Sequence, residues 1–157
     1  MSTAPKQPSA EAAEIMKAFV NGAARKQLGL QSIDLAAGLT IAKNHLQRGA
    51  QVEAMRTYVA LVLCEPANVE FQVGLANCCV QVGEPHLAIQ AASAVIALAP
   101  ADPRGYFLSG RACLEAGHLA EAEEDLRDAV EFGKKSRDAA IVEEAAQLLQ
   151  KISATKS

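Results

Sequence analysis

Three side chains that could bind a metal ion or act as nucleophiles recur at a constant interval in this sequence. His45, Cys79 and Cys113 follow one another at intervals of 34 residues. Imidazole and thiolate together would suit zinc if all three met around one ion. If the spacing reflects stacked repeat units, however, His45 and Cys113 lie two units apart and cannot share a small ligand shell. We therefore interpret the three as packing residues and expect neither a bound metal nor a cofactor.

The remaining reactive residue types give no catalytic pattern. The four cysteines (Cys64, Cys78, Cys79 and Cys113) form no Cys-x-x-Cys pair, and we expect them to be small buried apolar residues. An acidic run over 121–125 opens a predicted helix, where the helix dipole favours negative charge, and it is interpreted as a solvated face. Neither a Ser-His-Asp set nor a glycine-rich phosphate loop has supporting context. The sequence therefore predicts a protein that is not an enzyme.

Composition and charge narrow the class further. The chain has 157 residues, 50% of them hydrophobic, and a formal charge of -3. A basic face for nucleic acid or for an anionic membrane surface is not expected. Apolar stretches stay below the ~18 residues of a membrane helix, and residues 1–8 carry no signal pattern. We expect a cytoplasmic protein with a disordered start (1–8) and one domain (9–157).

A repeat of 34 residues organises the sequence. Gly49, Gly83 and Gly117 mark it. Other features keep a constant offset from each glycine: an alanine five residues later (Ala54, Ala88, Ala122), a small residue seven earlier (Ala42, Ala76, Gly110), and a closing Pro66, Pro100 or Lys134. Small residues let two antiparallel helices approach closely, glycine permits the turn between them, and proline ends the second helix. This pattern is typical of the tetratricopeptide repeat.

The repeat predicts an all-α fold of three helix pairs with a helix at each end. The repeats are expected at about 35–66, 69–100 and 103–134, and the C-terminal capping helix at about 137–153. The predicted helices span 33–48, 51–64, 68–82, 85–98, 103–116 and 119–132. Ser32 and Asn68 are predicted N-caps, and Pro85 suits a first turn. The bulky residue usual early in each repeat is present only as Tyr106, since Gly38 and Gln72 replace it in the others.

An amphipathic helix is predicted before the first repeat. Its apolar residues share one face at helical spacing, namely Ala12, Ile15, Met16, Phe19, Val20 and Ala23. This face must be covered. Either it caps the first repeat, or Ile15, Met16, Phe19 and Val20 form a dimer face with a second copy of the chain.

The first helix of each pair is expected to line the concave side of the stack. Nine residues at equivalent positions are predicted to face this groove: Leu39, Lys43, Leu46, Val73, Asn77, Val80, Phe107, Arg111 and Leu114. Such a mostly apolar surface suits an extended peptide with apolar anchors. Alternatives stay open, because Val73, Val80 and Leu114 can pack between repeats and the two cations can be solvated. Asn77 suits a hydrogen bond to a peptide backbone or a local one.

Two stretches narrow the resemblance to one family. The first stretch consists of residues 71–78, followed by Gly83 and 87–89, and the second consists of residues 102–104 and 117–123 with Phe107. Both stretches resemble bacterial type III secretion chaperones of translocator proteins, the SycD/LcrH/IpgC group. The resemblance implies a cytoplasmic, non-catalytic chaperone that keeps hydrophobic translocators soluble. It also implies a groove for a Pro-x-Leu-x-x-Pro segment, with Leu39, Leu46, Val73 and Phe107 at cargo-contacting positions, and a homodimer. The alternative is a general interaction scaffold that docks folded partners.

Overall fold

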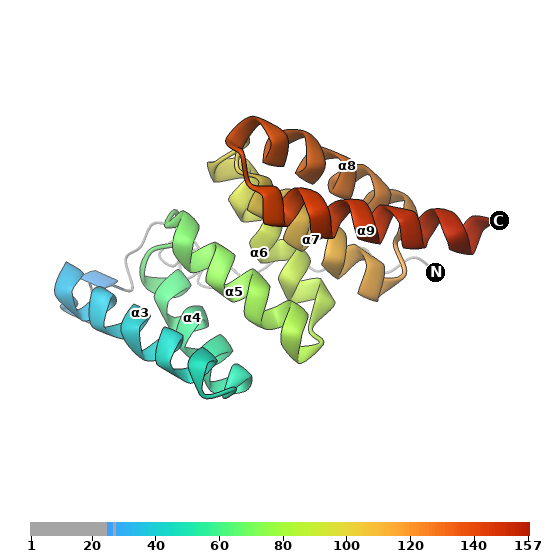
Figure 1. Ribbon diagram of the computed structural model, residues 1–157. Helices are drawn as coiled ribbons and strands as arrows, with labels where there is room; N and C mark the ends of the chain where they lie inside the picture. Colours follow the sequence, from blue (N-terminus) through green and yellow to red (C-terminus); the bar gives the residue numbers. More distant parts are fainter. Residues whose placement is uncertain (1–24, 27) are drawn as a thin grey trace, which may run out of the picture.

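Every regular element in the described part of the chain, residues 25–26 and 28–157 of a computed structural model, is helical (Figure 1). The named helices are α3 (Ser32–Gln47), α4 (Gln51–Cys64), α5 (Val69–Val82), α6 (Pro85–Leu98), α7 (Pro103–Ala116), α8 (Leu119–Ser136) and α9 (Ala139–Lys156). Each packs against the next, and α7 also contacts α5 and α9. The first helices of the second and third pairs, α5 and α7, therefore lie side by side in the predicted all-α fold.

The glycines that mark the repeat lie in the turns within the helix pairs. Gly49, Gly83 and Gly117 have φ angles of 74°, 85° and 81°, a region that other residues rarely adopt. A Cβ added to any of the three would meet no atom within 4 Å, so backbone conformation rather than space requires glycine there. A glycine with left-handed backbone conformation therefore recurs every 34 residues, in the turn within each helix pair.

Helix starts confirm Asn68 as an N-cap and correct Ser32. The Asn68 side chain accepts a hydrogen bond from the backbone N–H of Phe71 at 3.2 Å. Ser32 is instead the first residue of α3, and Gln31 occupies the cap position. The backbone N–H of Gln31 donates to Asp34 Oδ2 at 2.7 Å, so the carboxylate at the third helical position stabilises this start.

The third pair ends later than predicted. Helix α8 continues to Ser136, four residues beyond the expected end at 132. Lys134 stands where prolines close the first two pairs, so no backbone donor is missing and the helix continues. Arg137 then adopts φ 61°, and Asp138 caps α9 by accepting from the N–H of Ile141 at 3.1 Å. The last helix consequently spans 139–156 rather than 137–153.

The buried core consists of two clusters. The first combines α3 to α6 with two residues of α7, Leu108 and Ala112. The second combines Phe107 and Cys113 of α7 with apolar residues of α8 and α9. All four cysteines are free and buried, as expected from the sequence. Helix α7 therefore contributes to both clusters and joins the two halves of the core.

Gln72, one of the two departures from the usual bulky residue, makes the same contact as the tyrosine that conforms. Gln72 is buried, and its Nε2 donates to the carbonyl of Pro66 at 2.8 Å. At the equivalent position, the Tyr106 hydroxyl donates to the carbonyl of Pro100 at 2.7 Å. A glutamine and a tyrosine at equivalent positions thus donate the same hydrogen bond to the carbonyl of the proline that ends the preceding repeat.

Candidate functional site

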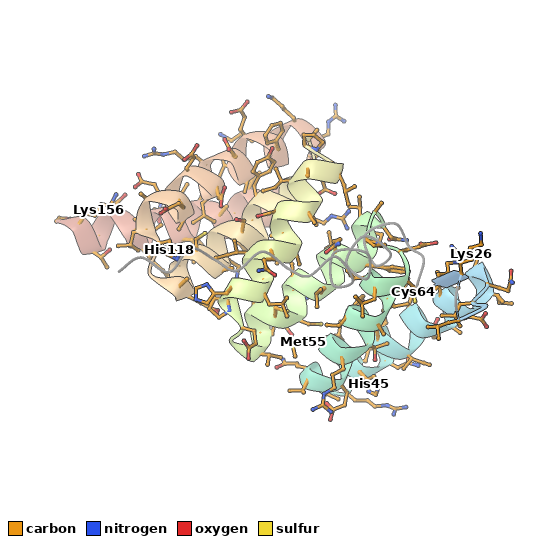
Figure 2. All side chains as sticks on the ribbon, turned by 180° about the vertical axis from the view of Figure 1, so that it is seen from behind. Lys26, His45, Met55, Cys64, His118 and Lys156 are labelled. Atoms are coloured by element: carbon orange, nitrogen blue, oxygen red, sulfur yellow. The ribbon has the colours of Figure 1, made fainter. Side chains whose placement is uncertain are left out.

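A cavity of about 300 Å³ lies where α3, α4, α5 and α7 meet. We call it the central cavity, and its lining consists of Leu46, Tyr58, Glu70, Val73, Gly74, Asn77, Arg104, Phe107 and Leu108. Four of these side chains are apolar, and the four polar ones come from three helices. Figure 2 shows the described side chains on the ribbon, seen from behind the view of Figure 1. The arrangement can hold an apolar group beside polar groups that fix its orientation.

Four of the nine predicted groove residues line the central cavity. They are Leu46, Val73, Asn77 and Phe107. Asn77 is half-buried, and its side chain makes no hydrogen bond to any described residue. Phe107 is only 8% exposed and also belongs to the second core cluster. Its role is therefore double, because the same ring supports the core and forms part of the cavity wall.

The other five predicted groove residues lie outside the cavity lining. Val80 is buried in the first core cluster with 3% exposure, which corrects its placement in the groove in favour of packing between repeats. Leu39 and Leu114 are half-buried against the first and second cluster, respectively. Lys43 is exposed, and the Arg111 guanidinium lies 5.7 Å from the centre of the Phe107 ring. These four remain predicted, untested groove residues.

One side of the cavity depends on a close contact between α4 and α5. Tyr58 lies against Gly74, and a Cβ at Gly74 would come within 2.1 Å of the tyrosine ring. One repeat later the sizes are reversed, with Ala92 equivalent to Tyr58 and Leu108 equivalent to Gly74. The missing side chain at Gly74 therefore gives Tyr58 the space to reach the cavity from a second helix.

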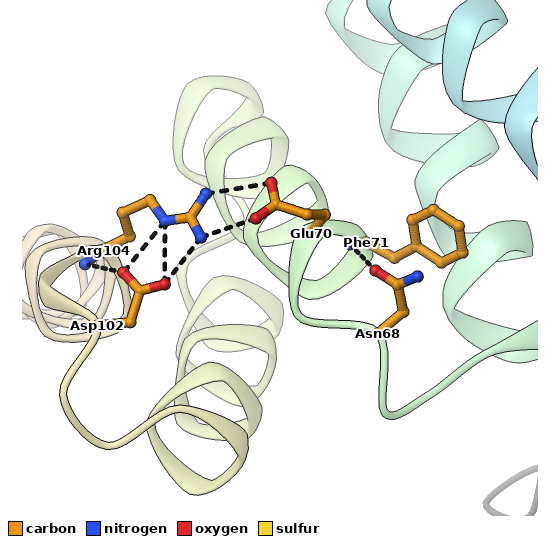
Figure 3. A network of polar contacts seen from close by, with 5 residues as sticks. All are labelled: Asn68, Glu70, Phe71, Asp102 and Arg104. Carbon is orange, nitrogen blue, oxygen red and sulfur yellow. Dashed lines mark hydrogen bonds and ion pairs between the residues drawn. The ribbon is translucent and has the colours of Figure 1, made fainter.

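A network of charged groups forms the polar rim (Figure 3). Arg104 donates to both carboxylate oxygens of Glu70, at 3.1 and 2.8 Å, and to Asp102. Glu70 and Arg104 occupy equivalent positions one repeat apart, so their bidentate ion pair links the second and third repeats. The hydrogen bond from Arg104 lowers the pKa of Glu70, and bonds to Asp102 and Glu70 raise the pKa of Arg104. This guanidinium is thus already occupied by two carboxylates.

Sequence reasoning missed five of the lining residues. They are Tyr58, Glu70, Gly74, Arg104 and Leu108. Two signals in the sequence pointed to some of them. Glu70 and Arg104 carry opposite charges at equivalent positions in adjacent repeats, and Gly74 is a glycine inside a helix, which lowers stability unless close packing requires it. Tyr58 carried no such signal, because the second helix of a pair was expected to face away from the groove.

The candidate dimer face of Ile15, Met16, Phe19 and Val20 lies outside the described residues, as does the expected disordered start. Within 25–26 and 28–157, no three His, Cys, Asp or Glu side chains gather as metal ligands would. Over the same residues, no helix combines the length and apolarity needed to cross a membrane.

Similarity to known proteins is found in structure. No model of a protein family and no curated protein matches the sequence. The chaperone SycD of Yersinia enterocolitica, solved with a peptide of the translocator YopD, is 27% identical with a TM-score of 0.74, over 81% of this chain and 98% of that one. PcrH of Pseudomonas aeruginosa, solved with the chaperone-binding region of PopD, is 23% identical with a TM-score of 0.76, over 82% and 98%.

A repeat domain of another kind also matches. The first tetratricopeptide domain of Spaghetti (RPAP3), bound to the HSP90 peptide SRMEEVD, is 21% identical with a TM-score of 0.70, over 81% of this chain and 97% of that one. The resemblance to translocator chaperones predicted from the sequence is confirmed by the SycD structures, whereas this last match is a likeness of fold.

Proposed function

We propose that this chain is a non-catalytic chaperone of type III secretion that binds an extended segment of a hydrophobic translocator protein and keeps that protein soluble. The central cavity carries this proposal, because it combines an apolar interior with a polar rim on the face where the first helices of the pairs meet. The SycD structure with a YopD peptide supports it. An apolar side chain of the segment would occupy the cavity, with the neighbouring backbone along the rim.

The charges at the rim favour an apolar segment over an acidic tail. A site for an acidic peptide needs cations that are free to pair with it. Arg104 lines the cavity but is paired with Glu70 and Asp102. The Glu70 side chain is 62% exposed and would repel an incoming carboxylate. The acidic peptide bound by the Spaghetti domain is therefore a poor guide to the ligand of this chain.

We propose in addition that the bound segment has a Pro-x-Leu-x-x-Pro sequence. A Pro-x-Leu-x-x-Pro segment is already extended in its unbound form, so binding costs it little conformational entropy. Its leucine would enter the central cavity. We further propose that the protein acts in the bacterial cytoplasm, where a translocator is made before it is secreted, and that it forms a homodimer through the face containing Ile15 and Phe19.

Coexpression with a translocator encoded nearby tests the proposal. Val73→Arg places a charge in the cavity wall and should leave the translocator insoluble. The matched control Ala97→Arg adds the same charge at an exposed position of α6 and should keep the translocator soluble. A translocator that is equally soluble without this chain would contradict the proposal. Loss of binding with the α6 variant alone would favour the general scaffold.

A further inference from the structure

Tyr58 is the cavity residue whose position its repeat does not explain. It belongs to α4, the second helix of the first pair, yet it lines a cavity formed mainly by first helices. Its side chain is almost entirely buried, with 4% exposure of the residue. The gap left by Gly74 lets the ring pass along α5, since any side chain there would occupy the same space.

The hydroxyl of Tyr58 has no hydrogen-bond partner among the described residues. Buried tyrosine hydroxyls usually find one. Even the more exposed hydroxyl of Tyr106 has a partner, the carbonyl of Pro100. No described side-chain nitrogen or oxygen is both sealed from solvent and unpaired. Tyr58 lines the central cavity, so its side chain is within reach of a group that is bound there. A polar group held in an apolar cavity by a buried ring is typical of a ligand-orienting group.

We propose that the Tyr58 hydroxyl donates a hydrogen bond to a backbone carbonyl of the bound segment and thereby fixes its register. This inference rests on the proposed function and names the recognition chemistry of that site. A segment that enters the cavity removes water from the hydroxyl, so it must offer an acceptor or lose affinity. Proline-containing segments suit this donor, because proline lacks an N–H but keeps its carbonyl.

Two further observations agree with a donor role. Burial raises the pKa of Tyr58 above its ordinary value of 10.0, so the phenol keeps its proton throughout the neutral range. Asn77 lines the same cavity with an amide that no described residue engages, and it offers a second donor to the same backbone. The two side chains come from α4 and α5, so the segment would contact both the first and the second repeat.

Tyr58→Phe tests the proposal because it removes only the hydroxyl. The probe is a short synthetic peptide with a Pro-x-Leu-x-x-Pro core, labelled for fluorescence anisotropy. Its affinity should fall roughly 2- to 10-fold, the range for one lost neutral hydrogen bond, while the thermal unfolding midpoint stays near that of the parent chain. The matched control is Tyr106→Phe, which removes a hydroxyl bonded to Pro100 and should leave the affinity unchanged.

A double-mutant cycle identifies the acceptor. Replacing one peptide amide by an ester weakens the preceding carbonyl as an acceptor. At one ester position the losses from the ester and from Tyr58→Phe should be less than additive, because both remove the same bond. Equal affinity of Tyr58→Phe and the parent chain, or additive losses at every ester position, would overturn this inference alone. A peptide that does not bind the parent chain, or binds Val73→Arg equally well, would overturn the proposed function as well.

Discussion

The contact between Gly74 and Tyr58 leads to a prediction whose sign is opposite to that of ordinary helix propensity. Replacing a glycine inside a helix by alanine normally stabilises a protein by about 1 kcal/mol. Here the new Cβ would lie 2.1 Å from Tyr58 Cε1, and carbon atoms pack at ~3.5 Å or more, so a rigid buried ring must move by about 1.4 Å. Overpacking costs about 1–3 kcal/mol, and the displacement of a rigid ring by this much falls in the upper part of that range. The cost is thus about 2–3 kcal/mol before the gain of about 1 kcal/mol in helix propensity is subtracted. We therefore expect Gly74→Ala to lower the free energy of unfolding by about 1–2 kcal/mol.

A cycle with Tyr58→Ala, followed by urea unfolding, isolates the contact. Without the ring, Gly74→Ala should stabilise the protein by up to ~1 kcal/mol, which makes the coupling between the two sites about 2–3 kcal/mol. Gly38→Ala is the matched control, since its Cβ would lie 3.0 Å from the flexible end of Leu61 and should be neutral or stabilising. The reasoning is refuted if Gly74→Ala is as stable as the parent chain, or if its effect is the same with and without Tyr58.

Three further predictions concern the rim and the core. Arg104→Gln should raise the pKa of Glu70, measured by carbon NMR, because the hydrogen bond from Arg104 lowers this pKa from the ordinary 4.5. The stability that the pair contributes is present above about pH 4.5 and is lost as the pH falls through the lowered pKa. The free energy of unfolding of the variant should therefore lack this dependence on acid pH. Gln72→Ala should cost about 1–3 kcal/mol in urea unfolding, because it leaves a proline carbonyl without its donor; no change would argue that water replaces the bond. Cys78 and Cys79, whose pKa values burial raises to about 11, should react with a thiol reagent at pH 8 only after unfolding, and rapid labelling of the native protein would contradict their burial.

The fold was predictable because its signals are backbone signals that recur. The turn glycines, the Asn68 cap and the prolines at helix ends act through local conformation, which a single sequence displays. The end of α8 was mispredicted because Lys134 carries no such signal and the helix simply continues. The predicted start at Ser32 was wrong by one residue, because Gln31 and Asp34 together stabilise an earlier cap.

The central cavity was predictable only in part, because periodicity assigns a residue to a helix face but does not measure the space between faces. Leu46, Val73, Asn77 and Phe107 line the cavity, yet Val80, one helical turn beyond Asn77, is buried. Tyr58 was missed because its position depends on the absence of a side chain on another helix. The large Tyr58 and the missing side chain at Gly74 compensate each other, and this is visible only once the packing of α4 against α5 is known.

The division of the core into two clusters bears on how the chain would unfold and on what a ligand would do to that process. The main contacts join helices that are one or two apart along the chain, so the two halves can open separately, as in other linear arrays. The central cavity takes Leu108 from the first cluster and Phe107 from the second. A ligand seated there would join the two halves, and native-state hydrogen exchange would then report slower opening in both α3–α6 and α8–α9. In this way a small contact area would make the whole array unfold more cooperatively.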